Sequence, residues 1–281
     1  MTGGSPDDWR VKLTLHYDGA GFHGWQVQPE QRTVQREVEA VLEQLTGSAV
    51  RLIAAGRTDT GVHATGQVAS GLVPARWTPA GLRRAMNALL PPDIWISAAV
   101  AVPLEFHARY DATARSYVYR LGTEDVARSP FHRRWCWPVG RALAPNSLAR
   151  AAACWTGEHS FGAFAKAGQP ERGERCTVYQ AAWREWPGVG YVFRVTANRF
   201  LHHMVRYMVG TMVDVAAGVR PIDDIAGLLG GAAGLRTSVP APPRGLFLSR
   251  VHYETNEWDG EEPDDEVLPG YGGPDRDPGR G

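Results

Sequence analysis

Hydrophobic and polar positions alternate along the chain with two different periods, which predict a regular succession of strands and helices. Stretches such as residues 11–17 alternate residue by residue, as half-buried strands do. After Thr33 the apolar residues recur three or four positions apart, which predicts a helix that ends at Gly47. A second helix is expected from Thr78–Pro79, where proline suits the first helical position. The first half is therefore expected to contain strands over 11–17, 50–55, 66–72 and 94–102 and helices over 33–47 and 78–90.

The second half repeats this plan on a larger scale. Glycines and a proline in 187–190 separate two alternating stretches, which predicts a hairpin. A strongly apolar helix is expected from about Phe200 to Ala217. The other expected elements are strands over 114–121, 176–186, 191–197 and 246–253 and helices beginning near 146 and 221.

This order of elements predicts an α+β fold built from two ferredoxin-like or RRM-like lobes. We expect their antiparallel sheets to meet at a central cleft, with helices on the outer faces. The N-terminal lobe would span residues 1–104 and the C-terminal lobe residues 105–254. Beyond Glu254 the glycine, proline and acid content predicts a disordered acidic tail over residues 255–281.

Charge is distributed unevenly, although the formal net charge of the whole chain is zero. Residues 255–281 contain nine acidic residues and two arginines, so residues 1–254 carry an excess of seven positive charges. A basic body with an acidic tail is typical of proteins that bind nucleic acids. The charge pattern therefore favours a nucleic-acid partner that the net charge alone would not suggest.

A glycine-flanked loop between two predicted strands gathers several functional groups, and its sequence is Gly56-Arg57-Thr58-Asp59-Thr60-Gly61-Val62-His63-Ala64. Asp59 is the first candidate for a catalytic carboxylate, because loops held by rigid strands often carry functional groups. The same residues are compatible with a simple turn in which Asp and Thr cap and Gly bends the chain. An acid protease is disfavoured, since its chemistry needs two carboxylates and the chain has one Asp-Thr-Gly.

The apolar helix predicted near residue 200 carries a cation among apolar neighbours. Leu201, Met204 and Met208 lie on one face, and Arg206 lies about 100° from that stripe. A buried guanidinium needs a carboxylate or several acceptors, because an unpaired charge costs several kcal/mol. The helix offers no acid three or four residues away, so the partner must come from elsewhere. Asp59 is the candidate that would explain both residues; a core carbonyl or another acid is the alternative.

Five blocks of the chain carry a family resemblance. Two of them are the loop from Gly56 to Ala64, with nine consecutive matching residues, and Phe200-Leu201-x-x-Met204-Val205-Arg206-x-x-Val209-Gly210. The others are Tyr17–Gln35, Phe106–Tyr119 and Pro240–Tyr253. Together they resemble the tRNA pseudouridine synthase A (TruA) family over about residues 11–254. His159-Ser160-Phe161 departs from the usual His-Asp-Phe, away from the proposed chemistry.

The resemblance implies an isomerase that converts uridine to pseudouridine in the anticodon stem-loop of tRNA, at positions 38, 39 and 40. It implies Asp59 as the nucleophile and Arg206 as its ion-pair partner. Tyr117 would stack on the target base and is a candidate acceptor of the C5 proton; without the resemblance it would be an ordinary strand tyrosine. Leu246 would pack against the base, and Arg57 would fill the space that a flipped base leaves or hold a phosphate. The resemblance also implies a homodimer that needs no cofactor.

Other functions find less support. His63, His202 and His203 lack the spacing of metal-binding motifs, so we expect no metal site. No apolar run approaches the ~20 residues of a membrane span, and the first residues lack the features of a signal peptide. Three cysteines without a Cys-x-x-Cys favour a reducing cytoplasm. The remaining alternative is a non-catalytic RNA-binding protein on the same fold, in which Asp59 would have no role.

Overall fold

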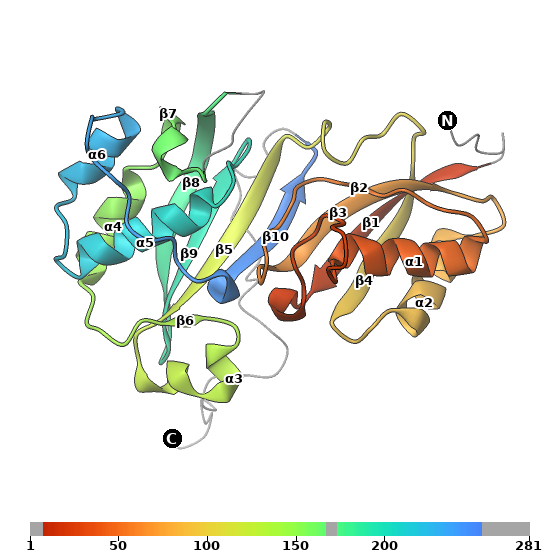
Figure 1. Ribbon diagram of the computed structural model, residues 1–281, viewed down its shortest axis with the longest axis horizontal. Coiled ribbons are helices and arrows are strands. Elements are labelled where there is room, and N and C mark those ends of the chain that lie inside the picture. Colours follow the sequence, from red (N-terminus) through yellow and green to blue (C-terminus); the bar gives the residue numbers. More distant parts are fainter. Residues whose placement is uncertain (1–7, 167–172, 255–281) are drawn as a thin grey trace, which may run out of the picture.

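The computed structural model describes residues 8–166 and 173–254, which form one large sheet flanked by helices (Figure 1). Within these residues the main path of the sheet has the order β4-β1-β3-β10-β5-β9-β8-β7, while β2 pairs with β3 and β6 with β5. The strands are β1 (Trp9–Tyr17), β2 (Ile53–Ala54), β3 (His63–Val73), β4 (Ile94–Val102), β5 (Ala114–Gly122), β6 (Trp137–Pro138), β7 (Gly157–Ser160), β8 (Arg175–Trp186), β9 (Gly190–Ala197) and β10 (Leu246–His252). The α-helices are α1 (Val34–Thr46), α2 (Pro79–Leu89), α3 (Pro130–Arg133), α4 (Pro145–Ala153), α5 (Met204–Ala216) and α6 (Asp223–Leu229).

The N-terminal part of the sheet is organised around β1. This strand pairs antiparallel with β3 on one side and β4 on the other. Its alternate residues Leu13 and Leu15 are fully buried, as are Val38 and Leu42 of α1 and Met86 of α2. Burial of each such side chain stabilises the fold by roughly 1.5–3 kcal/mol. The hydrophobic alternation in the sequence therefore corresponds to the contact between this sheet and its helices.

The C-terminal part has a second antiparallel run, β5-β9-β8-β7. Helix α5 packs beside α4, and the indole nitrogen of Trp183 on β8 lies 3.3 Å from the sulfur of Met212. Met208 and Met212 are completely buried. The apolar stripe of α5 is thus the face that covers this half of the sheet.

Strand β10 joins the two halves. It pairs parallel with β3 through Phe247 opposite His63 and antiparallel with β5 through Leu248 opposite Tyr117. Figure 1 shows β10 between the two groups of strands. The predicted α+β fold with mostly antiparallel strands is confirmed. The two predicted sheets are continuous with each other, because a strand from the end of the fold inserts between them.

Several predicted elements differ in extent from the observed ones. The apolar helix begins at Met204, not at Phe200. The left-handed backbone at His203 (φ 66°) is incompatible with an α-helix, so the helix cannot extend back through this residue. The strand expected over 50–55 is reduced to Ile53–Ala54. The predicted acidic tail, residues 255–281, lies outside the described residues. In the described part of the chain, no helix combines the length and the apolar character needed to cross a membrane.

Candidate active site

A cleft of about 960 Å³ opens beside the junction of the two halves. Its lining comes from the loop that precedes β3, from β5, and from the segment that leads into α5. Asp59, Tyr117 and Leu246 all line it, although they belong to three separate parts of the sequence. The fold therefore brings the sequence-predicted residues to one cavity.

The loop that carries Asp59 is held in place by hydrogen bonds to its backbone and side chains. The side-chain amide of Gln67 donates to the carbonyl of Gly56 at 2.9 Å. The hydroxyls of Tyr17 and Thr58 lie 2.8 Å apart, and the backbone N–H of Trp25 donates to the carbonyl of Thr58 at 3.1 Å. Since Tyr17 and Thr58 are buried, these bonds fix the loop on the N-terminal side of Asp59. On the other side, the N–H of Gly61 donates to the carbonyl of Phe22 at 3.3 Å.

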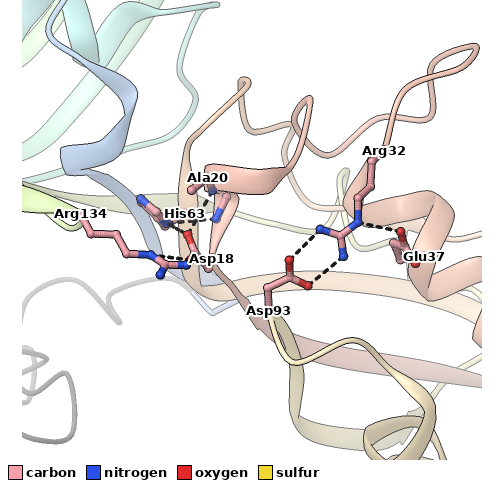
Figure 2. A network of polar contacts seen from close by, with 8 residues as sticks. Asp18, Ala20, Arg32, Glu37, His63, Asp93 and Arg134 are labelled. Atoms are coloured by element: carbon pink, nitrogen blue, oxygen red, sulfur yellow. Dashed lines mark hydrogen bonds and ion pairs between the residues drawn. The ribbon is translucent and has the colours of Figure 1, made fainter. Parts of the chain in front are cut away.

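The segment between β1 and α1 supports this loop and is itself anchored by two carboxylates (Figure 2). Asp18 contacts Nδ1 of His63 at 3.1 Å and also pairs with Arg134. At the other end of the segment, Arg32 donates to both carboxylate oxygens of Asp93, at 2.7 and 3.0 Å. Burial alone would raise the pKa of Asp18, but hydrogen bonds from His63, Ala20 and Arg134 outweigh it and lower that pKa to about 2.

Three nitrogen groups surround the carboxylate of Asp59. Nε2 of His202 lies 3.2 Å from one oxygen, and Nε2 of His203 lies 3.4 Å from the other. A guanidinium nitrogen of Arg206 lies 3.8 Å from the same oxygen as His203. The side chains of Asp59 and Arg206 are 18% and 13% exposed, so their charges interact with little screening by solvent.

Arg206 has a second partner that fixes its orientation. Its Nε donates to the carbonyl of Ala241 at 2.7 Å, and the N–H of Ala241 donates to the carbonyl of Arg206 at 2.9 Å. One turn further along α5, a Cβ added at Gly210 would lie 2.1 Å from the carbonyl oxygen of Val239. The absence of a side chain at Gly210 therefore lets the segment before β10 approach the helix and hold the guanidinium.

His203 occupies a constrained position at the start of α5. Burial lowers its pKa below the ordinary value of histidine, and the positive charge of Arg206 lowers it further, against the opposing effect of Asp59. Arg206 also lies 3.4 Å from Nε2 of His203. The neutral imidazole is therefore the favoured form beside the carboxylate at neutral pH.

Tyr117 lies on β5 with its ring edge against Phe200, 5.0 Å between ring centroids. Burial raises the pKa of Tyr117 well above its ordinary value, and the nearby charge of Asp59 acts in the same direction. Leu246, 4% exposed, begins β10 opposite Tyr119. The cleft thus has an aromatic and apolar floor beside the carboxylate.

Cations occupy the more open parts of the lining. Arg57 and Arg109 both line the cleft and are exposed. Among the described residues that line the cleft, Asp59 is the only acidic one. Such a lining suits a polyanion whose phosphates contact the rim while one nucleotide enters.

Comparison with known proteins assigns the family. The chain matches the model of a family described as tRNA pseudouridine synthase over residues 14–111 and 151–254. The tRNA pseudouridine synthase A of Moorella thermoacetica is 42% identical over 245 residues, which cover 86% of this chain and 99% of that protein. The chain belongs to the tRNA pseudouridine synthase family. The synthase A of Geobacter sp. is 37% identical over 250 residues, 86% of this chain and 98% of that protein.

The solved structure of a Cbf5–Nop10–Gar1 complex is a more distant match to this synthase family member. It has a TM-score of 0.35 and 11% sequence identity, over 84% of this chain and 57% of that chain.

The structure of this synthase family member brings Asp59 and Arg206 into contact and places Tyr117, Leu246 and Arg57 in the same cleft. Both partners considered for Arg206 are present, because it contacts a carboxylate and a core carbonyl.

The sequence analysis missed the contacts of His202 and His203 with Asp59. The usable signal was a pair of histidines directly before the apolar helix, four and three residues ahead of Arg206.

The histidines also bear on the prediction that the protein has no metal site. His63 is engaged by Asp18, whereas one ligand atom from each of Asp59, His202 and His203 lies within 4.8 Å of the others. Arg206 already places a positive charge against this group, which opposes the binding of a metal cation. The absence of a metal remains a prediction.

Proposed function

We propose that this protein forms pseudouridine in tRNA with Asp59 as its nucleophile. As a member of the tRNA pseudouridine synthase family, it is an isomerase. The single observation that carries the assignment of the nucleophile is the contact of Arg206 with Asp59, which itself lines a cleft rimmed by arginines. That arrangement places a carboxylate and its counter-ion where a nucleotide can enter.

The proposed chemistry stays within one nucleotide. Asp59 attacks the uridine at C6 of the base or at C1′ of the sugar, and the C1′–N1 bond breaks. The base turns and a C1′–C5 bond forms. The bond to Asp59 then breaks, C5 loses its proton and N1 takes up a proton, so that the product is an isomer of the substrate. No redox partner is needed, because no electrons leave the nucleotide. The residues of this chain supply a charged nucleophile, a counter-ion and a surface against which the base can turn.

Stacking is the role that we propose for Tyr117. Its raised pKa keeps the phenol protonated at neutral pH, which disfavours a function as the base that accepts the C5 proton. Aromatic stacking contributes roughly 1–3 kcal/mol per base. Leu246 would pack against the uracil. Arg57 would fill the space that the flipped base leaves or bind a phosphate.

We propose the anticodon stem-loop, at positions 38, 39 and 40, as the site of modification, and a homodimer in the cytoplasm as the working form. The family resemblance supports the first two proposals, and three free cysteines support a reducing compartment. Pseudouridine mapping of tRNA from cells that lack the gene would test the positions, and light scattering of the purified protein would test the dimer.

The Asp59→Asn variant distinguishes this function from non-catalytic RNA binding. It keeps the size and hydrogen-bonding capacity of the side chain but removes the nucleophile. We expect release of tritium from 5-³H-uridine-labelled tRNA to fall by roughly 10⁴-fold or more, the scale seen when a catalytic nucleophile is removed.

The binding of the same tRNA is the control for Asp59→Asn, and we expect its dissociation constant to change less than about threefold. Wild-type tritium release by the variant would refute Asp59 as the nucleophile. No release by the wild-type protein, with intact binding, would favour the RNA-binding alternative.

A further inference from the structure

The rim of the cleft presents cations that no carboxylate of the described residues neutralises. Arg57 and Arg109 are exposed and line the cleft from opposite halves of the chain. Among the described residues, neither forms an ion pair; the guanidinium of Arg109 lies 5.9 Å from the centre of the Tyr110 ring. An anionic segment close to this rim would find guanidinium groups that are accessible to carboxylates.

The last described residues of the chain lie beside this rim. The hydroxyl of Thr113 donates to the carbonyl of Glu254 at 3.1 Å, and its backbone N–H donates to the carbonyl of His252 at 2.9 Å. Thr113 lines the same cleft and follows Arg109 by four residues. The hydroxyl of Tyr253 is also fixed, since it donates to the carbonyl of Ala108 at 2.9 Å. Residues 255–281 therefore start beside the cleft, not at a remote surface.

The sequence that starts there is strongly acidic. The run 257–266 contains seven acidic residues and no basic residue, and its acids are Glu257, Asp259, Glu261, Glu262, Asp264, Asp265 and Glu266. Ten residues can span up to about 33 Å when extended, so the run can reach across a cleft of this size. The family match ends at residue 254, so the run is not part of the family pattern.

We propose that the acidic run 257–266 binds in cis to the arginines at the rim of the cleft and competes there with the phosphates of RNA. Tethering at Glu254 gives the run a local concentration in the millimolar range, which makes a weak contact effective. The run excludes RNAs that offer only phosphate contacts, whereas an RNA whose nucleotide also enters the cleft displaces it. This competition rests on the proposed function, but the binding of the run to the rim does not.

Neutralising the run within the full chain tests the competition. The variant replaces the four Glu of the run by Gln and the three Asp by Asn, so the length of the chain is unchanged. We expect its affinity for tRNA to exceed that of the wild type by roughly tenfold at 50 mM salt, and the difference to vanish near 0.5 M, because salt screens such contacts. Equal affinities at 50 mM salt, or weaker binding by the variant, would overturn the proposal.

A synthetic peptide of residues 255–281 tests the location of the contact without RNA. We expect the labelled peptide to bind the full-length variant whose acidic run has been neutralised. The double substitution Arg57→Gln with Arg109→Gln in that variant should abolish the binding. Arg128→Gln is the matched control, because Arg128 is 65% exposed and lies outside the lining of the cleft. Loss of peptide binding in that control alone, retention in the double variant, or no binding at 1 mM peptide would overturn the proposal.

The peptide readout also separates this proposal from the proposed catalysis. Asp59→Asn is expected to bind the peptide at least as well as its parent, because it removes a negative charge from the cleft. A protein that binds the peptide at the rim but lacks tritium release would refute the nucleophile and leave the contact of the run intact.

Discussion

Asp59 shares its carboxylate with one guanidinium and two imidazoles, and the identity of these partners decides its chemistry. Arg206 supplies a permanent charge that is 13% exposed. His203 supplies a group whose charge depends on pH, and its lowered pKa favours the neutral imidazole at neutral pH. Residue-scale changes should therefore separate a counter-ion from a neutral hydrogen-bonding neighbour.

Replacing Arg206 by Met removes the counter-ion while keeping a long apolar side chain. We expect turnover of tRNA to fall by roughly 10²-fold or more, the scale for loss of one electrostatic contact in an active site. The dissociation constant of tRNA should change little, because Arg206 lies beneath the cleft rim. Steady-state kinetics and filter binding measure the two quantities. Arg206→Lys keeps the positive charge but loses the planar guanidinium, so its turnover should lie between those of the wild type and the Met variant. Wild-type turnover in the Met variant would show that Arg206 has no role in the reaction.

Replacing His203 by Asn tests the pH dependence of stability. The folded-state pKa of His203 lies below its unfolded value of about 6.5, so the unfolded chain binds more protons at acid pH. The free energy of unfolding should therefore hold above about pH 6.5 and decrease as the pH falls below it. Asn tolerates the left-handed backbone and does not titrate, so urea unfolding between pH 5 and 7.5 should show a shallower decrease. Parallel pH profiles for the two proteins would contradict this.

At the scale of elements, the close approach of α5 to the segment before β10 holds Arg206 in place. The approach depends on Gly210, where a Cβ would meet the carbonyl oxygen of Val239 at 2.1 Å. The reciprocal bonds between Arg206 and Ala241 lie one turn away. A substitution at Gly210 should therefore displace Arg206 and affect the candidate active site, although Gly210 does not contact that site.

The variant Gly210→Ala tests this packing. We expect the free energy of unfolding to fall by about 1–3 kcal/mol, the usual cost of overpacking, and turnover to fall with it. Thermal denaturation and tritium release are the measurements. Thr211→Val is the control on the same helix, since the buried hydroxyl of Thr211 has no partner among the described residues and its loss should not destabilise. Unchanged stability and turnover in Gly210→Ala would show that the helix tolerates a shift here.

At the scale of the whole molecule, the pairing of β3 with β10 keeps the Asp59 loop beside α5. Asp59 precedes β3, whereas β10 follows the segment that Arg206 binds. A Cβ at Gly66 would lie 2.0 Å from the carbonyl oxygen of Ser249 and 3.1 Å from Cα of Arg250. Both contacts are with backbone, so no side-chain rotation can relieve them. Gly66 therefore sets the spacing between the two halves of the sheet.

The variant Gly66→Ala should separate these strands. We expect a loss of about 3 kcal/mol or more in the free energy of unfolding, and a turnover that falls further than the folded fraction does. Gly56→Ala provides the matched control for stability, because a Cβ there meets nothing within 4 Å. Urea unfolding and tritium release measure the effects. Equal stabilities for the two variants would contradict the proposed role of this contact.

Local sequence patterns were enough to predict most of the elements and to identify the candidate site residues. The alternation in β1 and the apolar stripes of α1, α2 and α5 are local periodicities that arise from burial of one face, so they could be recognised without coordinates. Thr78 and Gly47 marked helix ends, as the cap bond from Gly81 and the left-handed backbone at Gly47 show. The loop of Asp59 was identifiable because its residues are contiguous.

How distant segments meet follows from the three-dimensional fold and could not be predicted from local patterns. The insertion of β10 into the sheet and the contact of Asp59 with Arg206 depend on pairings between segments far apart in the chain, for which no local period exists. The left-handed backbone of His203, which places both imidazoles on the carboxylate, is held by surrounding contacts against its local preference. Local interactions thus selected the parts of this protein, while close backbone approach at positions such as Gly66 and Gly210 fixed their assembly.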